Sequence, residues 1–322
     1  MSEKTKEVSL EGEKRKDSVI SMIRTLLPIV GLIVVFLVFN TLTHGRMVEK
    51  FSLVMSQVYV TMIASTGVFF IMTMGGLDFS QGSILGMASI VVCVLSKISI
   101  PLAIAGGILT GAAIGAVNGF FYVNRKIKSF IVTICTMFLF RGIIKYLTSN
   151  SPVVGDIKLT LMGMNNTLKL VCTLIVIVLG FCAFRFTRLG IDLKAIGAGE
   201  KAAKFAGIRT DRMKFLIYVL AGAITGFAAF VNAIKVGSVT ASGGNQLETQ
   251  ILIALVLGGM PISGGAKCNF LNVIIGSLLY TVLISGLNML GLTTQAMQLV
   301  QGVIFLIFVA VFADRKSLQV IK

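Results

Sequence analysis

Residues 52–74 read SLVMSQVYVTMIASTGVFFIMTM, a run without a single charged side chain. An α-helix rises about 1.5 Å per residue, so about 20 predominantly apolar residues cross the roughly 30 Å hydrocarbon core of a bilayer. The apolar residues of this run are continuous and do not alternate with polar ones as in a strand of an outer-membrane barrel. The stretch therefore predicts a membrane-spanning helix.

The composition extends this prediction to the whole chain. Of 322 residues, 56% are hydrophobic and 13% are charged, and the mean hydropathy is +0.94. A soluble domain usually carries about 25% charged residues, and a globule of this length cannot hide so much apolar surface from water. These values exclude a soluble enzyme, a secreted disulfide scaffold and a disordered regulator, and they predict an all-α integral membrane protein.

Apolar stretches recur along the chain with short polar breaks, and we expect about ten transmembrane helices with both termini on one side. The third and eighth stretches are short for a straight crossing, so broken or re-entrant helices are expected there. The predicted spans are residues 26–42, 52–74, 82–96, 99–121, 127–147, 168–184, 213–234, 248–262, 270–290 and 295–313.

The basic residues indicate the orientation of these spans. The net charge is +16, from 29 Lys and Arg against 13 Asp and Glu. With the N-terminus inside, 21 of the 29 basic residues fall on the inner side, which is the positive-inside bias of membrane proteins. The excess charge therefore points to the lipid bilayer and needs no nucleic acid partner. Residues 1–25 and 314–322 are predicted cytoplasmic tails, and residues 26–313 are the predicted transmembrane domain.

Residue types for catalysis and metal binding are scarce. The five cysteines form no CxxC pair and are expected to pack as small apolar residues, and His44 is the one histidine. No Ser/His/Asp or Cys/His constellation can be assembled, and no G-x-x-x-x-G-K-[ST] phosphate loop occurs. We therefore expect no catalytic residue, no metal site and no cofactor in this chain.

The longest inner loop, residues 185–214, concentrates the basic residues. Within it, Glu200 to Phe205 is a good helix former that follows Gly199, and Gly207 can end a helix. The small side chains of this segment would let another protein approach closely. A docking helix is the favoured interpretation, and a basic loop that meets lipid headgroups is the alternative.

Several motifs in a shared order resemble a known family of permeases. The loop at 185–212 resembles the EAA-type coupling loop of ABC importer permeases, with Lys201 inserted in the motif. Residues 75–83, GGLDFSQGS, resemble the GG-I-D-L-S-V-G-S signature of the ribose-type sugar permeases. The resemblance covers roughly residues 50–313 and is also carried by residues 115–119, 130–137, 141–142, 257–265 and 286–291.

This resemblance implies the permease subunit of an ATP-binding-cassette importer in the bacterial cytoplasmic (inner) membrane. The implied solute is a monosaccharide or a related polyhydroxylated compound, moved by alternating access. The implied partners are an ATPase subunit that binds ATP and Mg, an extracytoplasmic solute-binding protein and a second permease copy. The residues expected to meet the ATPase are Ala195, Gly197, Glu200, Ala202, Ala203 and Gly207.

Polar residues within the spans are candidates for the solute path. Asp78 is a carboxylate between apolar segments, which is costly unless it lines a wet cavity, caps a helix or is paired. Either Asp78 or Ser80 could cap the helix that follows. Amide side chains suit hydroxyl-rich solutes because one amide both donates and accepts, and hydrogen bonding between helices is the alternative. The candidates are Asp78, Ser80, Gln81, Ser83, Asn118, Thr133, Thr136, Arg141 and Asn288.

Two kinds of small-residue pattern predict structural features. Residues 75–82 and 258–265 share Gly, Gly, Ser and Gly at matching places, which is a weak sign of an internal repeat. Glycines in the fourth span, Gly106, Gly107, Gly111 and Gly115, predict close packing between helices.

Two other functions stay open at this point. An ABC permease for branched-chain amino acids or nucleosides would have the same broad architecture, and the GG-x-D-x-S-x-G-S form argues for sugar. An ion-coupled secondary transporter would need buried acidic residues within the spans, where this sequence offers little beyond Asp78 and Glu248.

Overall fold

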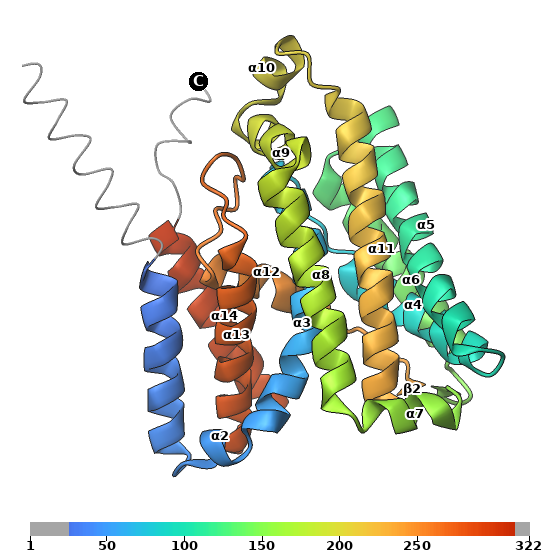
Figure 1. Cartoon of the computed structure of the whole chain (residues 1–322), viewed down its shortest axis with the longest axis vertical. Coiled ribbons are helices and arrows are strands. Elements are labelled where there is room, and N and C mark those ends of the chain that lie inside the picture. The colour runs from blue at the N-terminus through green and yellow to red at the C-terminus, as the bar shows by residue number, and fades with distance from the viewer. Residues whose placement is uncertain (1–25, 313–322) are drawn as a thin grey trace, which may run out of the picture.

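The computed structural model describes residues 26–312, with side chains described for residues 26–307. The two predicted cytoplasmic tails, residues 1–25 and 314–322, lie outside the described residues. The described chain is a bundle of helices with one short two-stranded sheet (Figure 1).

The helices and strands follow the apolar runs closely. The helices are Leu26–Leu42, α2 (Arg46–Glu49), α3 (Phe51–Thr73), α4 (Gln81–Ser96), α5 (Ile100–Asn124), α6 (Ser129–Leu147), α7 (Ile157–Gly163), α8 (Asn166–Phe186), α9 (Arg188–Ala198), α10 (Glu200–Phe205), α11 (Thr210–Val236), α12 (Leu247–Leu257), α13 (Leu271–Met289) and α14 (Thr294–Phe312). Strands β1 (Val153–Val154) and β2 (Ser238–Val239) pair antiparallel, with Val153 opposite Val239.

Each of the ten predicted spans coincides with one helix, but the helices differ in length. Six of the described helices are long and apolar enough to cross a membrane: α3, α5, α6, α8, α11 and α13. The third and eighth predicted spans are the short helices α4 and α12. At about 1.5 Å per residue, the 11 residues of α12 extend about 16 Å, roughly half of a bilayer core. The predicted span 248–262 is too long, because the helix ends where Gly258, Gly259 and Pro261 follow.

Helix α3, which contains most of the run at 52–74, is the centre of the bundle. In its most apolar 18-residue window 83% of the residues are buried, against 22% in α6 and 28% in α5 and α8. A helix that is apolar on every side has no polar stripe to turn toward water. In this fold the neighbouring helices α8, α11, α12 and α13 surround it, so this uncharged run meets protein more than lipid.

Helices α5 and α11 pack backbone to backbone through glycines. A Cβ atom added at Gly111 would overlap the carbonyl oxygen of Gly222, and one added at Gly107 would lie 2.9 Å from the carbonyl oxygen of Gly226. Small residues at every fourth position let two helix backbones approach in this way. The prediction of close packing at Gly107, Gly111 and Gly115 is confirmed. Gly106 instead faces the Leu95 side chain of α4.

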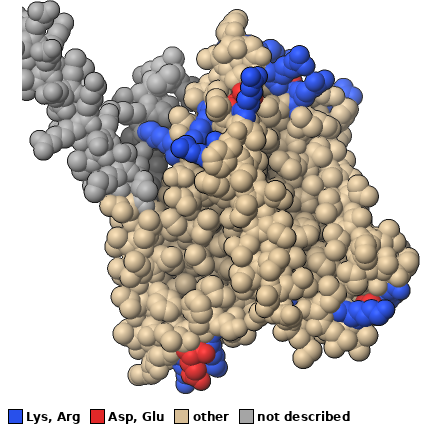
Figure 2. Space-filling model, in the orientation of Figure 1, with Lys and Arg blue, Asp and Glu red and all other residues tan. Residues whose placement is uncertain are grey.

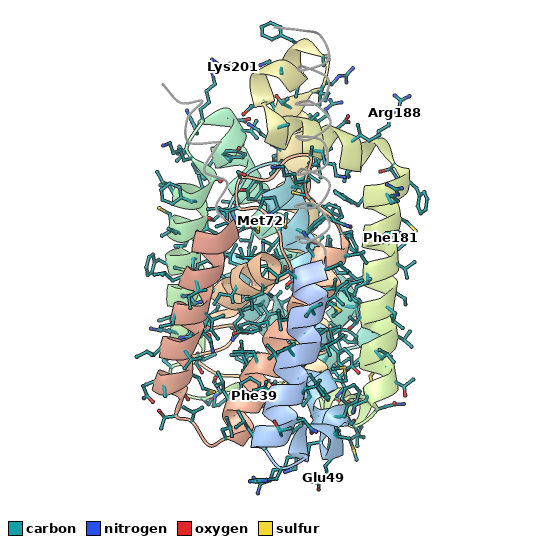
Figure 3. All side chains as sticks on the ribbon, turned by 90° about the vertical axis from the view of Figure 1, so that its left-hand side faces the viewer. Phe39, Glu49, Met72, Phe181, Arg188 and Lys201 are labelled. Carbon is teal, nitrogen blue, oxygen red and sulfur yellow. The ribbon has the colours of Figure 1, made fainter. Side chains whose placement is uncertain are left out.

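The charged residues gather at the two ends of the bundle. Figure 2 shows Lys, Arg, Asp and Glu at both ends of the face in view, with a broad band free of charge between them. Lys201 and Arg188 lie at the end formed by α9 and α10, and Glu49 lies at the opposite end (Figure 3). An uncharged belt between two charged ends is the layout expected of a protein that crosses a membrane.

Candidate functional site

The break between α3 and α4 holds a buried carboxylate that is fully hydrogen-bonded. Oδ1 of Asp78 accepts hydrogen bonds from the backbone N–H of Ser80 at 2.7 Å and from its hydroxyl at 2.6 Å. Oδ2 accepts one from Nε2 of Gln81 at 2.6 Å. Ser80 is the N-cap position of α4, but its side chain makes no capping bond. Capping by Ser80 is therefore wrong, and Asp78 satisfies the backbone at this helix start instead.

This carboxylate is the centre of a network that joins four helices, which we call the Asp78 network. Asn118 of α5 donates from Nδ2 to the Ser80 hydroxyl oxygen at 2.8 Å, and Thr225 of α11 donates its hydroxyl hydrogen to Oε1 of Gln81. Oγ1 of Thr133 on α6 accepts the backbone N–H of Phe79 at 3.2 Å. The start of α4 is thus fixed to α5, α6 and α11 by polar contacts.

Most of the residues predicted to line the solute path therefore lie close together in the structure, but they are buried and bonded within this network. Asp78, Ser80, Gln81, Ser83, Asn118 and Thr133 are each no more than 1% exposed. The hydroxyl of Ser83 donates to the Ser80 carbonyl oxygen at 2.7 Å. Thr136 is buried one turn further along α6, whereas Asn288 is exposed in the last turn of α13 and takes no part in the network.

Arg141 belongs to a second group of polar residues, which lies where the starts of α4 and α12 meet. Its guanidinium pairs with Oε1 of Glu248 at 2.6 Å and donates to Oδ1 of Asn245. A Cβ atom added at Gly82 would overlap both Oε2 of Glu248 and the Gly244 carbonyl oxygen, so the two helix starts touch. The side chains of Arg141 and Glu248 are 20% and 9% exposed.

Beside this ion pair lies a polar cavity of about 250 Å³, which we call the α3–α13 cavity. It lies in the half of the bundle away from α10, since α11 begins next to α10 and contributes Lys235 from its last turn. The amide side chains in its wall are those of Gln57, Asn232, Asn245 and Gln250, and its other polar residues are Thr61, Lys235, Tyr280 and Thr281.

These cavity residues were not among the candidates predicted from the sequence. Gln57, Asn232 and Gln250 each stand inside a predicted span among mostly apolar neighbours, which is a usable signal. The motifs drew attention instead to the Asp78 segment, none of whose residues lines the α3–α13 cavity. Only the fold shows that the amides of α3, of α11, of α12 and of the segment before α12 line one space.

The inner loop at 185–214 folds into α9, α10 and the start of α11. Helix α10 spans Glu200–Phe205 as predicted. Gly207 has φ of +86°, its N–H bonds the Lys204 carbonyl oxygen at 3.1 Å, and the Ile208 N–H bonds that of Ala203 at 3.1 Å. This pair of bonds is the Schellman ending, which needs a residue without a Cβ penalty in the left-handed region.

The predicted docking residues divide into exposed and internal ones. Ala202 and Gly207 are exposed, whereas Ala203 is 3% exposed and packs inward. Glu200 forms an ion pair with Lys214 of α11, which fixes α10 to that helix. Phe205, which the sequence analysis did not single out, is 93% exposed. Helix α10 lies at one end of the bundle (Figure 1), so this exposed aromatic ring lies at that end too.

Gly197 serves a contact inside the protein. A Cβ atom there would overlap the Thr73 carbonyl oxygen and approach the backbone N of Gly265 to 2.6 Å. The N–H of Gly265 donates to the same Thr73 oxygen at 2.9 Å. The two similar Gly-Gly segments, 75–82 and 258–265, thus lie side by side, and α9 packs on their junction. Ala195, on the same helix, is half-buried.

Next to α10 is a basic groove of about 390 Å³ between α9 and the start of α11. Arg188, Arg209 and Arg212 line it together with Asp192 and Gly207. The groove borders the Schellman turn that ends α10.

Comparison with known proteins agrees with these features. The family model described as "Branched-chain amino acid transport system / permease component" matches residues 51–309. The ribose import permease protein RbsC of Bacillus subtilis (strain 168) is 30% identical over 319 residues, covering 96% of this chain and 98% of the relative. RbsC of Escherichia coli (strain K12) is 28% identical over 301 residues, covering 90% and 93%. The L-arabinose ABC transporter permease protein AraH of Azospirillum brasilense is 31% identical over 260 residues, covering 78% and 76%.

No solved structure is a significant match to the chain. The family match begins at the first residue of α3 and ends within α14, so it includes both polar groups, the α3–α13 cavity and α10. These matches confirm the resemblance to ABC sugar permeases that the motifs predicted: the chain belongs to the family of branched-chain amino acid transport system permease components.

Proposed function

We propose that this chain is the membrane-spanning permease subunit of an ABC importer for a monosaccharide or a related polyhydroxylated compound. The observation that carries the proposal is the similarity to sugar permeases over nearly the full length of the chain and of its relatives. The family model alone is described by branched-chain amino acid transport, so the named relatives are what favour sugar.

ATP hydrolysis belongs to a separate ATPase subunit, which binds ATP and Mg and docks on α10. The exposed Phe205 ring supports this assignment, because a lone aromatic side chain projecting from a short helix is the kind of anchor that fills a pocket on a partner. Ala202 and Gly207 lie exposed nearby, and Glu200 transmits movement of α10 to α11 through Lys214.

The remaining partners and the location follow from the same proposal. A second permease copy completes the pathway, and an extracytoplasmic solute-binding protein delivers the solute to the end opposite α10. The basic residues around α9 and α10 support a cytoplasmic location for that end under the positive-inside rule, and the proposal puts both tails on the same side of a bacterial inner membrane.

The proposed mechanism is alternating access. ATP binding closes the ATPase pair, α10 moves with it, and α9 transfers the movement to the junction of the two Gly-Gly segments through Gly197. That junction is directly followed by the Asp78 network, which joins α4 to α5, α6 and α11. A switch between two packed arrangements of these helices would open the cavity to one side or the other.

Reconstituted uptake tests the proposal. The chain is co-expressed with its ATPase and binding protein, and uptake of labelled monosaccharides into proteoliposomes is measured with and without ATP. We expect uptake only with ATP and with the ATPase present. Uptake without the ATPase, driven by an ion gradient, would instead establish a secondary transporter, and selective uptake of branched-chain amino acids would overturn the sugar assignment.

Variants of α10 test the docking step in the same assay. Gly207→Glu and Phe205→Asp should each abolish most ATP-dependent uptake and reduce co-purification of the ATPase, while the permease still inserts. Gly207→Asn is the matched control, because asparagine tolerates the left-handed conformation and keeps the Schellman ending. Normal uptake and normal co-purification in Gly207→Glu and Phe205→Asp would remove α10 from the interface.

A further inference from the structure

We propose that the α3–α13 cavity is a binding site for one uncharged, polyhydroxylated molecule of monosaccharide size. The cavity measures about 250 Å³, the space of about eight water molecules at roughly 30 Å³ each. Pockets for drug-sized ligands span about 300–1,000 Å³. The space therefore suits a single sugar ring better than an oligosaccharide.

The donors and acceptors in the wall favour hydroxyl groups. Within the described part of the chain, the amide groups of Gln57 and Gln250 make no hydrogen bond, so they are available to a ligand. Asn232 makes only a long bond of 3.4 Å, from Nδ2 to the Ser89 hydroxyl oxygen. Each amide presents one acceptor and two donor hydrogens, and a hydroxyl group both donates and accepts. Three amides from α3, α11 and α12 thus converge on one space with most of their capacity unused.

The charges around the cavity disfavour amino acids. The residues that line it include Lys235 but no carboxylate, so an ammonium group would enter without a partner. Glu248, the nearest acidic residue along α12, has its Oε1 bound by Arg141 and is not part of the wall. A neutral solute needs no such partner, and Lys235 is an exposed residue in the last turn of α11.

Asn245 connects this site to the helix starts. It lines the cavity, and its Oδ1 also accepts the hydrogen bond from Arg141, which pairs with Glu248. A ligand that binds Asn245 therefore contacts the group that holds the starts of α4 and α12 together. The cavity occupies the half of the bundle opposite α10, so under the proposed function, on which this role rests, it receives solute before the inward switch.

Protection from chemical labelling tests binding directly. Asn232→Cys is placed in a chain whose five native cysteines are replaced by alanine, and the full transporter is labelled with a water-soluble maleimide. D-ribose at millimolar concentration should slow labelling at least threefold, whereas L-leucine and ribose 5-phosphate should not. Lys158→Cys, exposed on α7 and not part of the wall, is the matched control whose labelling should not respond to sugar.

The outcomes separate this inference from the proposed function. If D-ribose and a panel of other neutral monosaccharides fail to protect position 232, the site assignment is wrong even where ATP-dependent uptake is intact. Stronger protection by leucine or by the phosphate ester overturns the neutral-ligand assignment. Protection by a sugar without any ATP-dependent uptake would support the site and overturn the proposed function.

A variant that fills the cavity tests the site without requiring that the sugar bind tightly enough to protect a cysteine. Ile284→Trp places a large ring in the wall and should reduce sugar transported per ATP hydrolysed at least tenfold. Leu271→Trp, exposed at the other end of the same helix, should stay within twofold of the unmodified transporter. The chain contains no tryptophan, so the fluorescence of the added tryptophan reports the folding and insertion of each variant without background. Equal transport by the two correctly inserted variants would exclude the cavity from the pathway.

Discussion

Asp78 shows why a carboxylate can lie buried in an apolar bundle. Burying a charge without partners is very costly, so such a group must be paired or fully hydrogen-bonded. Three donors from Ser80 and Gln81 meet its two oxygens, and Gln81 and Ser80 are bound in turn by Thr225 and Asn118. The residue therefore serves the structure of the helix start, whatever its role in transport.

Asp78→Ala should lower stability markedly. It leaves three buried donors on Ser80 and Gln81 without an acceptor, and each unsatisfied group costs about 1–3 kcal/mol. We expect the melting temperature in detergent to fall by about 5 °C or more. Asp78→Asn should cost less, because the Gln81 amide can turn to accept from the new NH₂ group. Asp211→Ala, on an exposed residue, is the control, and an equal effect of all three changes would contradict this account.

The Arg141–Glu248 pair should behave as a coupled unit. Breaking a buried ion pair from one side leaves an uncompensated charge and costs about 3–5 kcal/mol, whereas replacing both partners by apolar residues is often close to neutral. Arg141→Met and Glu248→Met should each lower the melting temperature more than the double variant does. Additive effects of the two single changes would show that the charges act separately.

At the scale of elements, glycine decides which helices can touch. Within α5 the spacing of Gly107, Gly111 and Gly115 forms one smooth stripe, and α11 presents Gly222 and Gly226 to it. Without side chains at the contact, carbonyl oxygens of one helix lie against Cα atoms of the other. This arrangement gains dispersion contacts where the hydrophobic effect between lipid-embedded helices is absent.

The same Gly→Ala substitution at two positions tests the contribution of this helix contact to stability. Gly111→Ala places a Cβ atom on the Gly222 backbone and must separate α5 from α11, so the melting temperature should fall. Gly142→Ala on α6 meets nothing within 4 Å and should be neutral or raise stability by about 0.5–1 kcal/mol through helix propensity. A stabilised Gly111→Ala variant would mean that the two helices do not pack as described.

At the scale of the whole molecule, the two ends differ in chemistry and should face opposite sides of the membrane. One end carries α9, α10 and the basic groove, and the other carries α2, α7 and the short sheet (Figure 1). By the positive-inside rule, we expect the first end to face the cytoplasm.

Cysteine labelling in intact cells checks this orientation. With the native cysteines replaced, Glu49→Cys should react with a membrane-impermeant maleimide from outside, and Lys201→Cys should react only after the membrane is permeabilised. Both positions are exposed and lie at opposite ends of the molecule (Figure 3). The reverse pattern would invert the assignment of solute entry and ATPase docking.

Features that depend on residues close together in the chain could be predicted from the sequence, and features that depend on distant segments could not. The ten apolar runs, α10 with its glycine ending and the glycine stripe of α5 could be predicted, because each depends on neighbours within a few positions along the chain. The role of Ala203 could not be predicted, since whether a residue on α10 faces outward or packs against the rest of the protein depends on how the loop folds back. The α3–α13 cavity was missed for the same reason: its amides come from three separate stretches of the chain, in α3, in α11 and in residues 245–250.

Apolar run length, charge placement and co-ordered motifs are local properties, so they were enough to predict a helical membrane permease. Which polar residues are hydrogen-bonded inside the protein depends on the tertiary fold. Asp78 accepts a hydrogen bond from Gln81 and Asn118 donates one to Ser80, whereas within the described residues the amides of Gln57 and Gln250 line the α3–α13 cavity and make no hydrogen bond. The physical reason is that a hydrogen bond depends on distances between segments far apart in the chain, which no single run of residues contains.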